Sequence, residues 1–302
     1  MIKGILSETK AGTKIIITLA SVVLCFVVFN IIAIVCGIAF FDINLLSDPH
    51  TLLNITEEKI AFMKFFQAIQ SLGMFVFSAL LAVFLYSKSI RNELDLKPTK
   101  IVAVIIAIIL SFTITPLLGL SMHLNSFLEL PDFMTGIQEW MQSKEDSIAE
   151  MTKLLLDVEG FGGLIANLLV IAVIPAIGEE FIFRGIIQKQ FGKIFKNHHI
   201  AIFVAAFIFS AIHLQFFGFL PRFILGIVLG YLYVWSKSLW LPILFHFFNN
   251  GKAVVTAYCT DIDKAMSNEF SLDSNFLASF IFFTAITVLL MIVLYKLHKR
   301  KI

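Results

Sequence analysis

Residues 164–187 read LIANLLVIAVIPAIGEEFIFRGII, a run that is long and apolar enough to cross a lipid bilayer as one helix. Charged residues nevertheless interrupt it: the adjacent glutamates Glu179 and Glu180, and Arg184 one helical turn later. A charged side chain at that depth costs several kcal/mol when it has no partner, so such residues within a membrane span are rare and usually functional. This stretch therefore predicts a membrane helix and marks where to look for a site.

The rest of the chain has the composition of an integral membrane protein. Hydrophobic residues make up 59% of its 302 positions and the mean hydropathy is +0.92, well above the values of soluble domains. The apolar runs lack the two-residue alternation of a membrane barrel, which leaves helices as the spanning elements. We expect an all-α fold, a polytopic transmembrane helical bundle. A net charge of +2 gives no reason to expect a nucleic acid partner, and Cys25, Cys36 and Cys259 have neither metal-site nor disulfide-framework spacing.

About eight segments are predicted to span the membrane. Their approximate limits are 15–41, 62–86, 101–120, 161–188, 200–217, 221–236, 239–257 and 274–296. Between the third and fourth, residues 132–158 carry apolar side chains at helical spacing among charged ones, which predicts an amphipathic helix at the membrane interface. This helix is either a connector packed over the bundle or a lid that controls access for a substrate.

The positions of Lys and Arg predict the orientation, because short loops rich in these residues stay in the cytoplasm. If the N-terminus is inside, the cytoplasmic segments contain Lys3, Lys10, Lys14, Lys88, Arg91, Lys97, Lys100, Lys189, Lys193, Lys196, Lys237, Lys296, Lys299, Arg300 and Lys301. The opposite loops, at 42–58, 129–159 and 261–273, are acidic instead. We therefore predict that both termini face the cytoplasm, N-in and C-in.

Polar residues in the fourth span have a spacing that separates two roles. Glu180 and Arg184 are four residues apart with the acid first, which favours an ion pair on one helix face. Glu179 points about 100° away and stays free for another partner. Pro175, one turn earlier, lacks a backbone N–H and predicts a kink or a loosened helix at this point.

Two further spans place polar residues at a similar depth. The fifth contains FIFSAIHLQF, with Phe209 and His213 on one face, and the seventh contains ILFHFFNNG, with His246 and Asn250 on one face. A single polar residue in a span forms a structural hydrogen bond between helices about as often as it has a functional role. Counted along each helix, however, these residues fall in one layer with Glu179, which predicts a shared, water-containing cavity open to the cytoplasmic side.

This set of side chains suits the hydrolysis of an amide. Glu179 and His213 can hold and deprotonate a water, while His246 and Asn250 can donate hydrogen bonds to the oxyanion of the tetrahedral intermediate. In this interpretation no metal or other cofactor is required. A zinc ion held by Glu179, His213 and His246 is the alternative, although the sequence has no His-Glu-x-x-His motif.

At these positions the sequence resembles the CPBP family, the CAAX protease and bacteriocin-processing enzymes that are also called Abi-type or type II CAAX prenyl endopeptidases. Three motifs carry the resemblance, in order and within about residues 160–251: Glu-Glu-x-x-x-Arg at 179–184, Phe-x-x-x-His at 209–213 and His-x-x-x-Asn at 246–250. The resemblance implies that Glu179 is the catalytic base, that His213 is its partner on the water, and that His246 and Asn250 form the oxyanion site. It implies a supporting role for the pair Glu180 and Arg184.

These observations predict an intramembrane endopeptidase that acts in the lipid bilayer on a membrane-associated peptide or protein. We expect residues 1–160 to form an N-terminal part with three spans and the amphipathic segment, 161–257 the catalytic core, and 258–302 an outer loop and a last span. A composition rich in Lys, Ile, Phe and Asn, without a eukaryotic sorting signal, favours a bacterial inner membrane. A non-catalytic scaffold or bacteriocin self-immunity protein is the alternative, and a proton-coupled transporter is disfavoured because the spans show no two-halves repeat.

Overall fold

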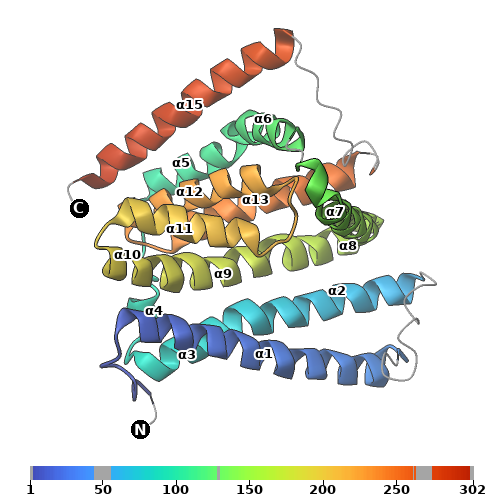
Figure 1. Ribbon diagram of the computed structural model, residues 1–302, viewed down its shortest axis with the longest axis horizontal. Helices are drawn as coiled ribbons and strands as arrows, with labels where there is room; N and C mark the ends of the chain where they lie inside the picture. The colour runs from blue at the N-terminus through green and yellow to red at the C-terminus, as the bar shows by residue number, and fades with distance from the viewer. Residues whose placement is uncertain (1–2, 44–55, 128–129, 261, 263–273, 300–302) are drawn as a thin grey trace.

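The computed structural model is a bundle of helices, most of which run along one common direction (Figure 1). It describes residues 3–43, 56–127, 130–260, 262 and 274–299. Every regular element within these ranges is helical, which confirms the all-α prediction.

The helices fall into four groups along the chain. The N-terminal part contains α1 (Ala11–Phe40), α2 (Glu57–Ser71), η1 (Leu72–Phe77), α3 (Ser78–Tyr86), α4 (Ile90–Glu93), α5 (Ile101–Thr113) and α6 (Thr115–Ser126). The amphipathic segment forms η2 (Asp132–Met134) and α7 (Thr135–Leu156). A long central helix is built from α8 (Gly160–Asn167), η3 (Leu168–Val173), α9 (Ile174–Glu180), η4 (Phe181–Gln188) and α10 (Lys189–Phe195). The last group contains α11 (His198–Ala211), α12 (Phe219–Ser236), α13 (Trp240–Cys259) and α15 (Ser274–His298).

Five helical stretches of the described residues are long and apolar enough to cross a membrane. They are Ala11–Phe40, Glu57–Tyr86, Gly160–Phe195, Phe219–Ser236 and Phe276–His298. The third predicted span differs from the expected single helix, because α5 and α6 meet at a bend of 40° beside Pro116 and make a sixth crossing only if they are taken together.

The remaining predicted segments are also helical, but they are not among the five stretches that are long and apolar enough to cross a membrane. The fifth segment forms α11, which is apolar but has only 14 residues. The seventh forms α13, whose 20 residues include several polar ones. The chain is thus an all-α membrane bundle, and the number of eight spans stays a prediction.

The stretch quoted at the outset lies in the centre of this bundle. Figure 1 shows α9 and α10 between α1 to α3 on one side and α11 to α13 on the other. All eight residues of η4 are buried, and its apolar side chains form one core with residues of α3, α11 and α12. In contrast, α1 and α15 expose large apolar side chains, such as Val23 (63%) and Ile281 (66%), as expected for helices that face lipid.

The segments predicted to be cytoplasmic lie together at one end of the bundle. Asp95, in the connection from α4 to α5, joins two of them: its Oδ2 accepts hydrogen bonds from Lys189 Nζ at 2.9 Å and from the Tyr233 hydroxyl at 2.8 Å. The end of α15 reaches the same region, because Lys100 Nζ donates to Leu297 O at 3.0 Å. Figure 1 shows both chain ends on this side. The predicted topology requires this arrangement, and which side of the membrane the end faces stays a prediction.

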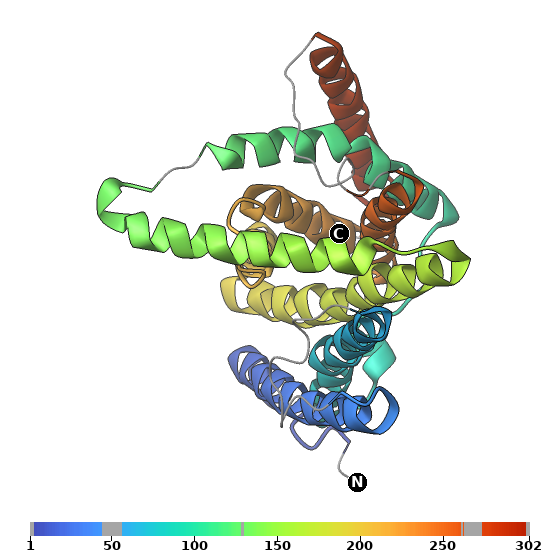
Figure 2. The same cartoon turned by 90° about the vertical axis from the view of Figure 1, so that its right-hand side faces the viewer.

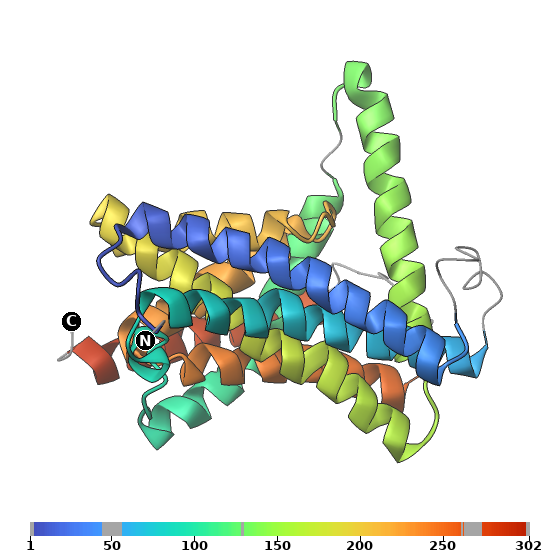
Figure 3. The same ribbon diagram turned by 90° about the horizontal axis from the view of Figure 1, so that it is seen from below.

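The amphipathic segment forms α7, as predicted, at the opposite end of the bundle. Figures 2 and 3 show α7 running crosswise to the long helices. That direction suits a helix in the plane of a membrane interface. The predicted acidic loops fall partly outside the described residues, at 44–55, 129, 261 and 263–273, as do Arg300 and Lys301.

Two glycines let α12 pack closely on α11. A Cβ atom on Gly226 would lie 2.9 Å from the Cβ of Ala206, and one on Gly230 would lie 2.8 Å from Cγ2 of Ile202. The carbonyl oxygen of Gly226 accepts a hydrogen bond from Arg184 Nη2 at 3.2 Å. Small residues at this spacing therefore serve an interface inside the bundle and bring a backbone acceptor to the central helix.

Candidate active site

Glu180 and Arg184 form an ion pair in the core of the bundle. Arg184 Nη1 donates to Glu180 Oε1 across 2.7 Å, and the two side chains are only 1% and 0% exposed. The guanidinium carbon of Arg184 also lies 4.6 Å from the centre of the Phe209 ring. This is the pair that the four-residue spacing predicts, and its burial explains why neither charge can be left without the other.

His246 reaches this pair from α13. Its Nδ1 lies 2.9 Å from the same Glu180 Oε1 that Arg184 holds, and its Nε2 lies 3.9 Å from Oε2 of Glu179. An ionised carboxylate only accepts hydrogen bonds, so Nδ1 carries a proton and Nε2 is the nitrogen that can gain or lose one. Glu180 therefore fixes the orientation of the ring, and the reactive edge of the ring faces Glu179.

His213 does not lie within a helix but in the loop that follows α11. Its Nδ1 lies 2.7 Å from the carbonyl oxygen of Phe209, which can only accept, so Nε2 is again the free nitrogen. Within the described part of the chain, no direct hydrogen bond joins His213 to Glu179. The Phe209 ring stands edge-on to both imidazoles, with centroid distances of 5.1 Å to His213 and 6.1 Å to His246.

Asn250 follows His246 by one turn and is held by the central helix. Its Nδ2 donates to the carbonyl oxygen of Ile171 at 3.2 Å. Ile171 is four residues before Pro175, which has no N–H to offer that oxygen, so Asn250 supplies the missing donor. The predicted loosening of the helix takes the form of η3, a wide π-helical turn directly before Pro175.

Arg222, in the first turn of α12, holds the loop that carries His213, a role that the sequence pattern did not predict. It donates to the backbone oxygen of Gln215 at 3.2 Å and to the side-chain oxygen of the same residue. The available signal for this role of Arg222 was a charged residue at the edge of an apolar span.

The loop with His213 is held at the end of the bundle where α7 lies. Asn125 of α6 donates to Phe216 O at 2.7 Å and accepts from the N–H of Leu220 at 3.0 Å. Trp140 of α7 contacts Phe216, with ring centroids 5.6 Å apart. The sequence predicted that His213 lies in a cavity open to the cytoplasmic side. In the structure α11 ends at Ala211, and His213 lies beyond this helix end, on the side that the predicted orientation places outside.

Glu179, His213 and His246 do not form a metal-binding group in this arrangement. Among the residues that the structure describes, no cluster of three or more His, Cys, Asp or Glu side chains could hold a metal ion. Nδ1 of both histidines faces a protein oxygen, which leaves one nitrogen on each ring. The zinc alternative therefore depends on the sequence pattern and needs a chelation experiment.

Comparison with known proteins supports the resemblance for one segment of the chain. Residues 161–251, which contain all three motifs, match the sequence profile described as Type II CAAX prenyl endopeptidase Rce1-like. The chain is 32% identical over 91 residues to the membrane-embedded CAAX protease MroQ of Staphylococcus aureus, an alignment that covers 28% of this chain and 36% of that protein. It is 29% identical over 87 residues to the uncharacterized protein YpbD of Bacillus subtilis, covering 28% of this chain and 41% of that protein. No solved structure matches the chain.

Proposed function

Since residues 161–251 carry the motifs and the profile of the CAAX endopeptidase family, we propose that this chain is an intramembrane endopeptidase that hydrolyses a peptide bond with Glu179 as general base. The observation that supports this role is the unequal use of the two glutamates. Glu180 is occupied by Arg184 and His246, whereas Glu179 faces the free nitrogen of His246 at 3.9 Å. That gap is too long for a direct hydrogen bond and suits a bridging molecule.

The proposed reaction uses a water between Glu179 and His213. Glu179 takes one proton from the water, and Nε2 of His213 accepts a hydrogen bond from its other O–H. The water oxygen then bonds to the substrate carbonyl carbon. When the carbon–nitrogen bond breaks, Glu179 returns the proton to the leaving amine.

His246 and Asn250 are proposed to stabilise the oxyanion of this intermediate. Nε2 of His246 lies on the side of Glu179, and when this nitrogen carries a proton it can donate a hydrogen bond to the oxyanion. One N–H of the Asn250 amide is bonded to Ile171, and the other is available to the oxyanion. The buried ion pair of Glu180 and Arg184 keeps this arrangement in place and does not itself react.

The substrate class that fits this site is a peptide or protein held in the membrane, because the site lies among apolar helices. MroQ is described as a membrane-embedded CAAX protease, and the matched segment covers about a third of it, so the bond that this chain cuts is not inferred from that name. We place the chain in a bacterial inner membrane with both ends in the cytoplasm. Cysteine labelling tests this orientation in a background where Cys25, Cys36 and Cys259 are changed to alanine. A membrane-impermeant reagent on intact cells should label Glu150→Cys on α7 and leave Lys88→Cys unlabelled, and the reverse result would reject the orientation.

The test of the proposed activity compares purified wild type, Glu179→Gln and Glu150→Gln in lipid nanodiscs on a library of membrane peptides. Glu150→Gln is a matched control, because it makes the same chemical change on an exposed face of α7. Removal of a general base should lower the rate about 100-fold or more, while the control keeps full activity. Undiminished cleavage by Glu179→Gln would reject the proposal.

A strong zinc chelator, added to each sample, tests the alternative chemistry. Activity that survives chelation supports the glutamate-based reaction. Activity that is lost and then restored by added zinc would instead assign Glu179, His213 and His246 as metal ligands.

A further inference from the structure

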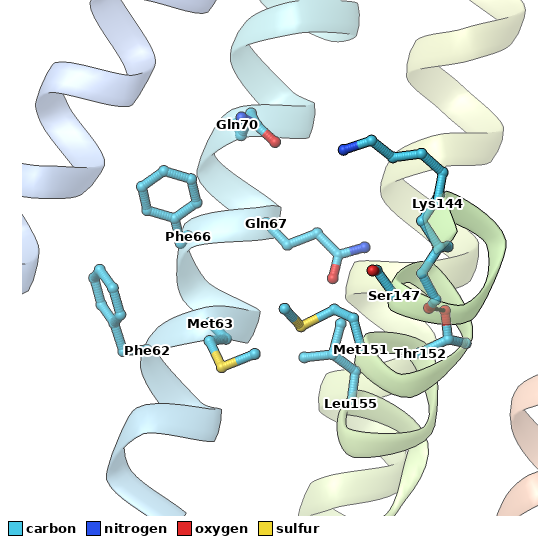
Figure 4. Close-up of a pocket in the computed structure, with 11 residues that line it drawn as sticks. Phe62, Met63, Phe66, Gln67, Gln70, Lys144, Ser147, Met151, Thr152 and Leu155 are labelled. Carbon is cyan, nitrogen blue, oxygen red and sulfur yellow. Dashed lines mark hydrogen bonds between the residues drawn. The ribbon is translucent and has the colours of Figure 1, made fainter. Parts of the chain in front are cut away.

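A cavity of about 710 Å³ lies between α2 and α7 (Figure 4). Its α2 side carries Phe62, Met63 and Phe66, and its α7 side carries Met151 and Leu155. The volume falls in the range of pockets that bind ligands in other proteins. Methionine and phenylalanine walls of this kind adapt to apolar groups of different shape.

One polar group in this cavity has no partner. Figure 4 shows Gln67 extending from α2 toward α7, beside Ser147 and Met151. Its Oε1 is buried and accepts no hydrogen bond, whereas the neighbouring Gln70 donates to Asn30 Oδ1 at 3.3 Å. Buried polar atoms are nearly always satisfied in folded proteins, and a donor that enters the cavity would satisfy this acceptor.

Both walls of the cavity continue into elements that hold the candidate active site. On one side, α2 leads directly into η1, where a Cβ on Gly178 would lie only 2.6 Å from the Cβ of Phe75. Gly178 immediately precedes Glu179. On the other side, Trp140 of α7 contacts Phe216 in the loop that carries His213, with ring centroids 5.6 Å apart.

We propose that this cavity binds an apolar, extended segment of the peptide substrate, next to the bond that is cut. The proposal rests on the endopeptidase function given above and adds the place and the form in which the substrate binds. An extended peptide presents a backbone N–H to Gln67 while its side chains pack on Met63 and Met151. A lipid acyl chain fills the same volume but has no donor for the amide oxygen.

Photo-crosslinking tests this proposal without requiring cleavage. Glu179→Gln protein in nanodiscs carries p-benzoylphenylalanine in place of Met151 and is irradiated with fluorescein-labelled apolar peptides of randomised sequence. The matched control carries the same group in place of Ile292, which lines a separate cavity between α12 and α15. We expect several-fold stronger peptide labelling from position 151 than from position 292, and a several-fold loss of that labelling when Gln67→Leu is added.

Equal labelling from the two positions, or phospholipid in place of peptide on position 151 by mass spectrometry, would overturn the proposal. If Gln67→Leu unfolds, Ser147→Trp provides a second variant, because Ser147 lines the cavity from an exposed position and a tryptophan there should block it. Labelling at position 151 without cleavage of the same peptides by wild type would reject the endopeptidase function and keep the binding site. Cleavage by wild type without labelling at position 151 would reject the binding site alone.

Discussion

His246 is bonded to Glu180 through Nδ1, across 2.9 Å, and this carboxylate is the one that Arg184 already holds. The three side chains form one buried unit, at 2%, 0% and 1% exposure. Glu180 is thus tied to the structure, while its sequence neighbour Glu179 is available for chemistry. Adjacent glutamates on one helix can take separate roles because consecutive residues point about 100° apart.

This division predicts that substitutions of the two glutamates cost stability to very different extents. Glu180→Ala should lower the free energy of unfolding by about 3–5 kcal/mol, because it leaves Arg184 as an uncompensated buried charge. Glu179→Gln should cost far less, since Glu179 makes no comparable bond. Denaturant unfolding in detergent, followed by intrinsic fluorescence, measures both. A larger loss for Glu179→Gln than for Glu180→Ala would contradict the assignment.

Asn250 and Pro175 should be coupled in stability. Asn250→Ala leaves the Ile171 carbonyl without its donor and should cost about 1–3 kcal/mol. In a Pro175→Ala background the backbone regains an N–H near this oxygen, so the same change should cost less, by about 1 kcal/mol. A double-mutant cycle from unfolding curves gives this coupling energy. Additive costs would show that the amide does not replace the donor that proline removes.

Arg222 should act on the rate through the loop that carries His213. Arg222→Gln removes the hydrogen bonds to Gln215 and should lower kcat about 10- to 100-fold by misplacing the imidazole, with a small effect on KM. Arg91→Gln, an exposed arginine at the other end of the bundle, is the control. Peptide cleavage kinetics in nanodiscs separate the two constants. A change in KM alone would place Arg222 in substrate binding instead.

Gly226 should not tolerate a side chain. A Cβ there would meet Ala206 at 2.9 Å, so Gly226→Ala should cost about 1–3 kcal/mol through overpacking of α12 on α11. Gly12→Ala is a matched control, because nothing lies within 4 Å of its Cβ position and alanine favours a helix by about 1 kcal/mol. Melting temperatures in detergent should therefore move in opposite directions. Equal values for both variants would rule out the close packing.

Asp95 should make stability depend on pH at the Lys-rich end. Burial acts to raise the pKa of this carboxyl, but the hydrogen bond and charge of Lys189, with Tyr233 and Lys97, outweigh it and hold the pKa below its ordinary 3.8. A lowered folded-state pKa contributes stability above the ordinary value, and this contribution is lost as the pH falls through the lowered one.

The corresponding variant is Asp95→Asn. It should cost about 1–3 kcal/mol near neutral pH, and the difference from wild type should shrink as the pH falls below 3.8. Unfolding curves at a series of pH values measure it. A constant difference over that range would mean that the charge of Asp95 is not what stabilises this end.

Local patterns predicted the parts of this protein that depend on spacing along one helix. The pair of Glu180 and Arg184, the helix of the amphipathic segment and the Lys-rich end all follow from residue spacing or charge placement. The bend between α5 and α6 was missed even though Pro116 is a sufficient signal for it. The sequence alone could not predict that Arg222 holds Gln215 in the loop that carries His213, because those bonds depend on the conformation of the loop between α11 and α12.

The three π-helical turns η1, η3 and η4 all border the candidate site. The geometry of the site therefore depends on the number of residues in these helices as well as on which residues they contain. A π turn holds one more residue than an α turn over the same rise, so it is a built-in insertion. A deletion in α9 before Glu179 has no such extra residue to absorb it, and it would rotate the residues on one side by about 100° against the other. Glu179 would then point away from α13 with every site residue still present. In the evolution of this chain, single-residue insertions and deletions in the central helix should therefore be rarer than substitutions.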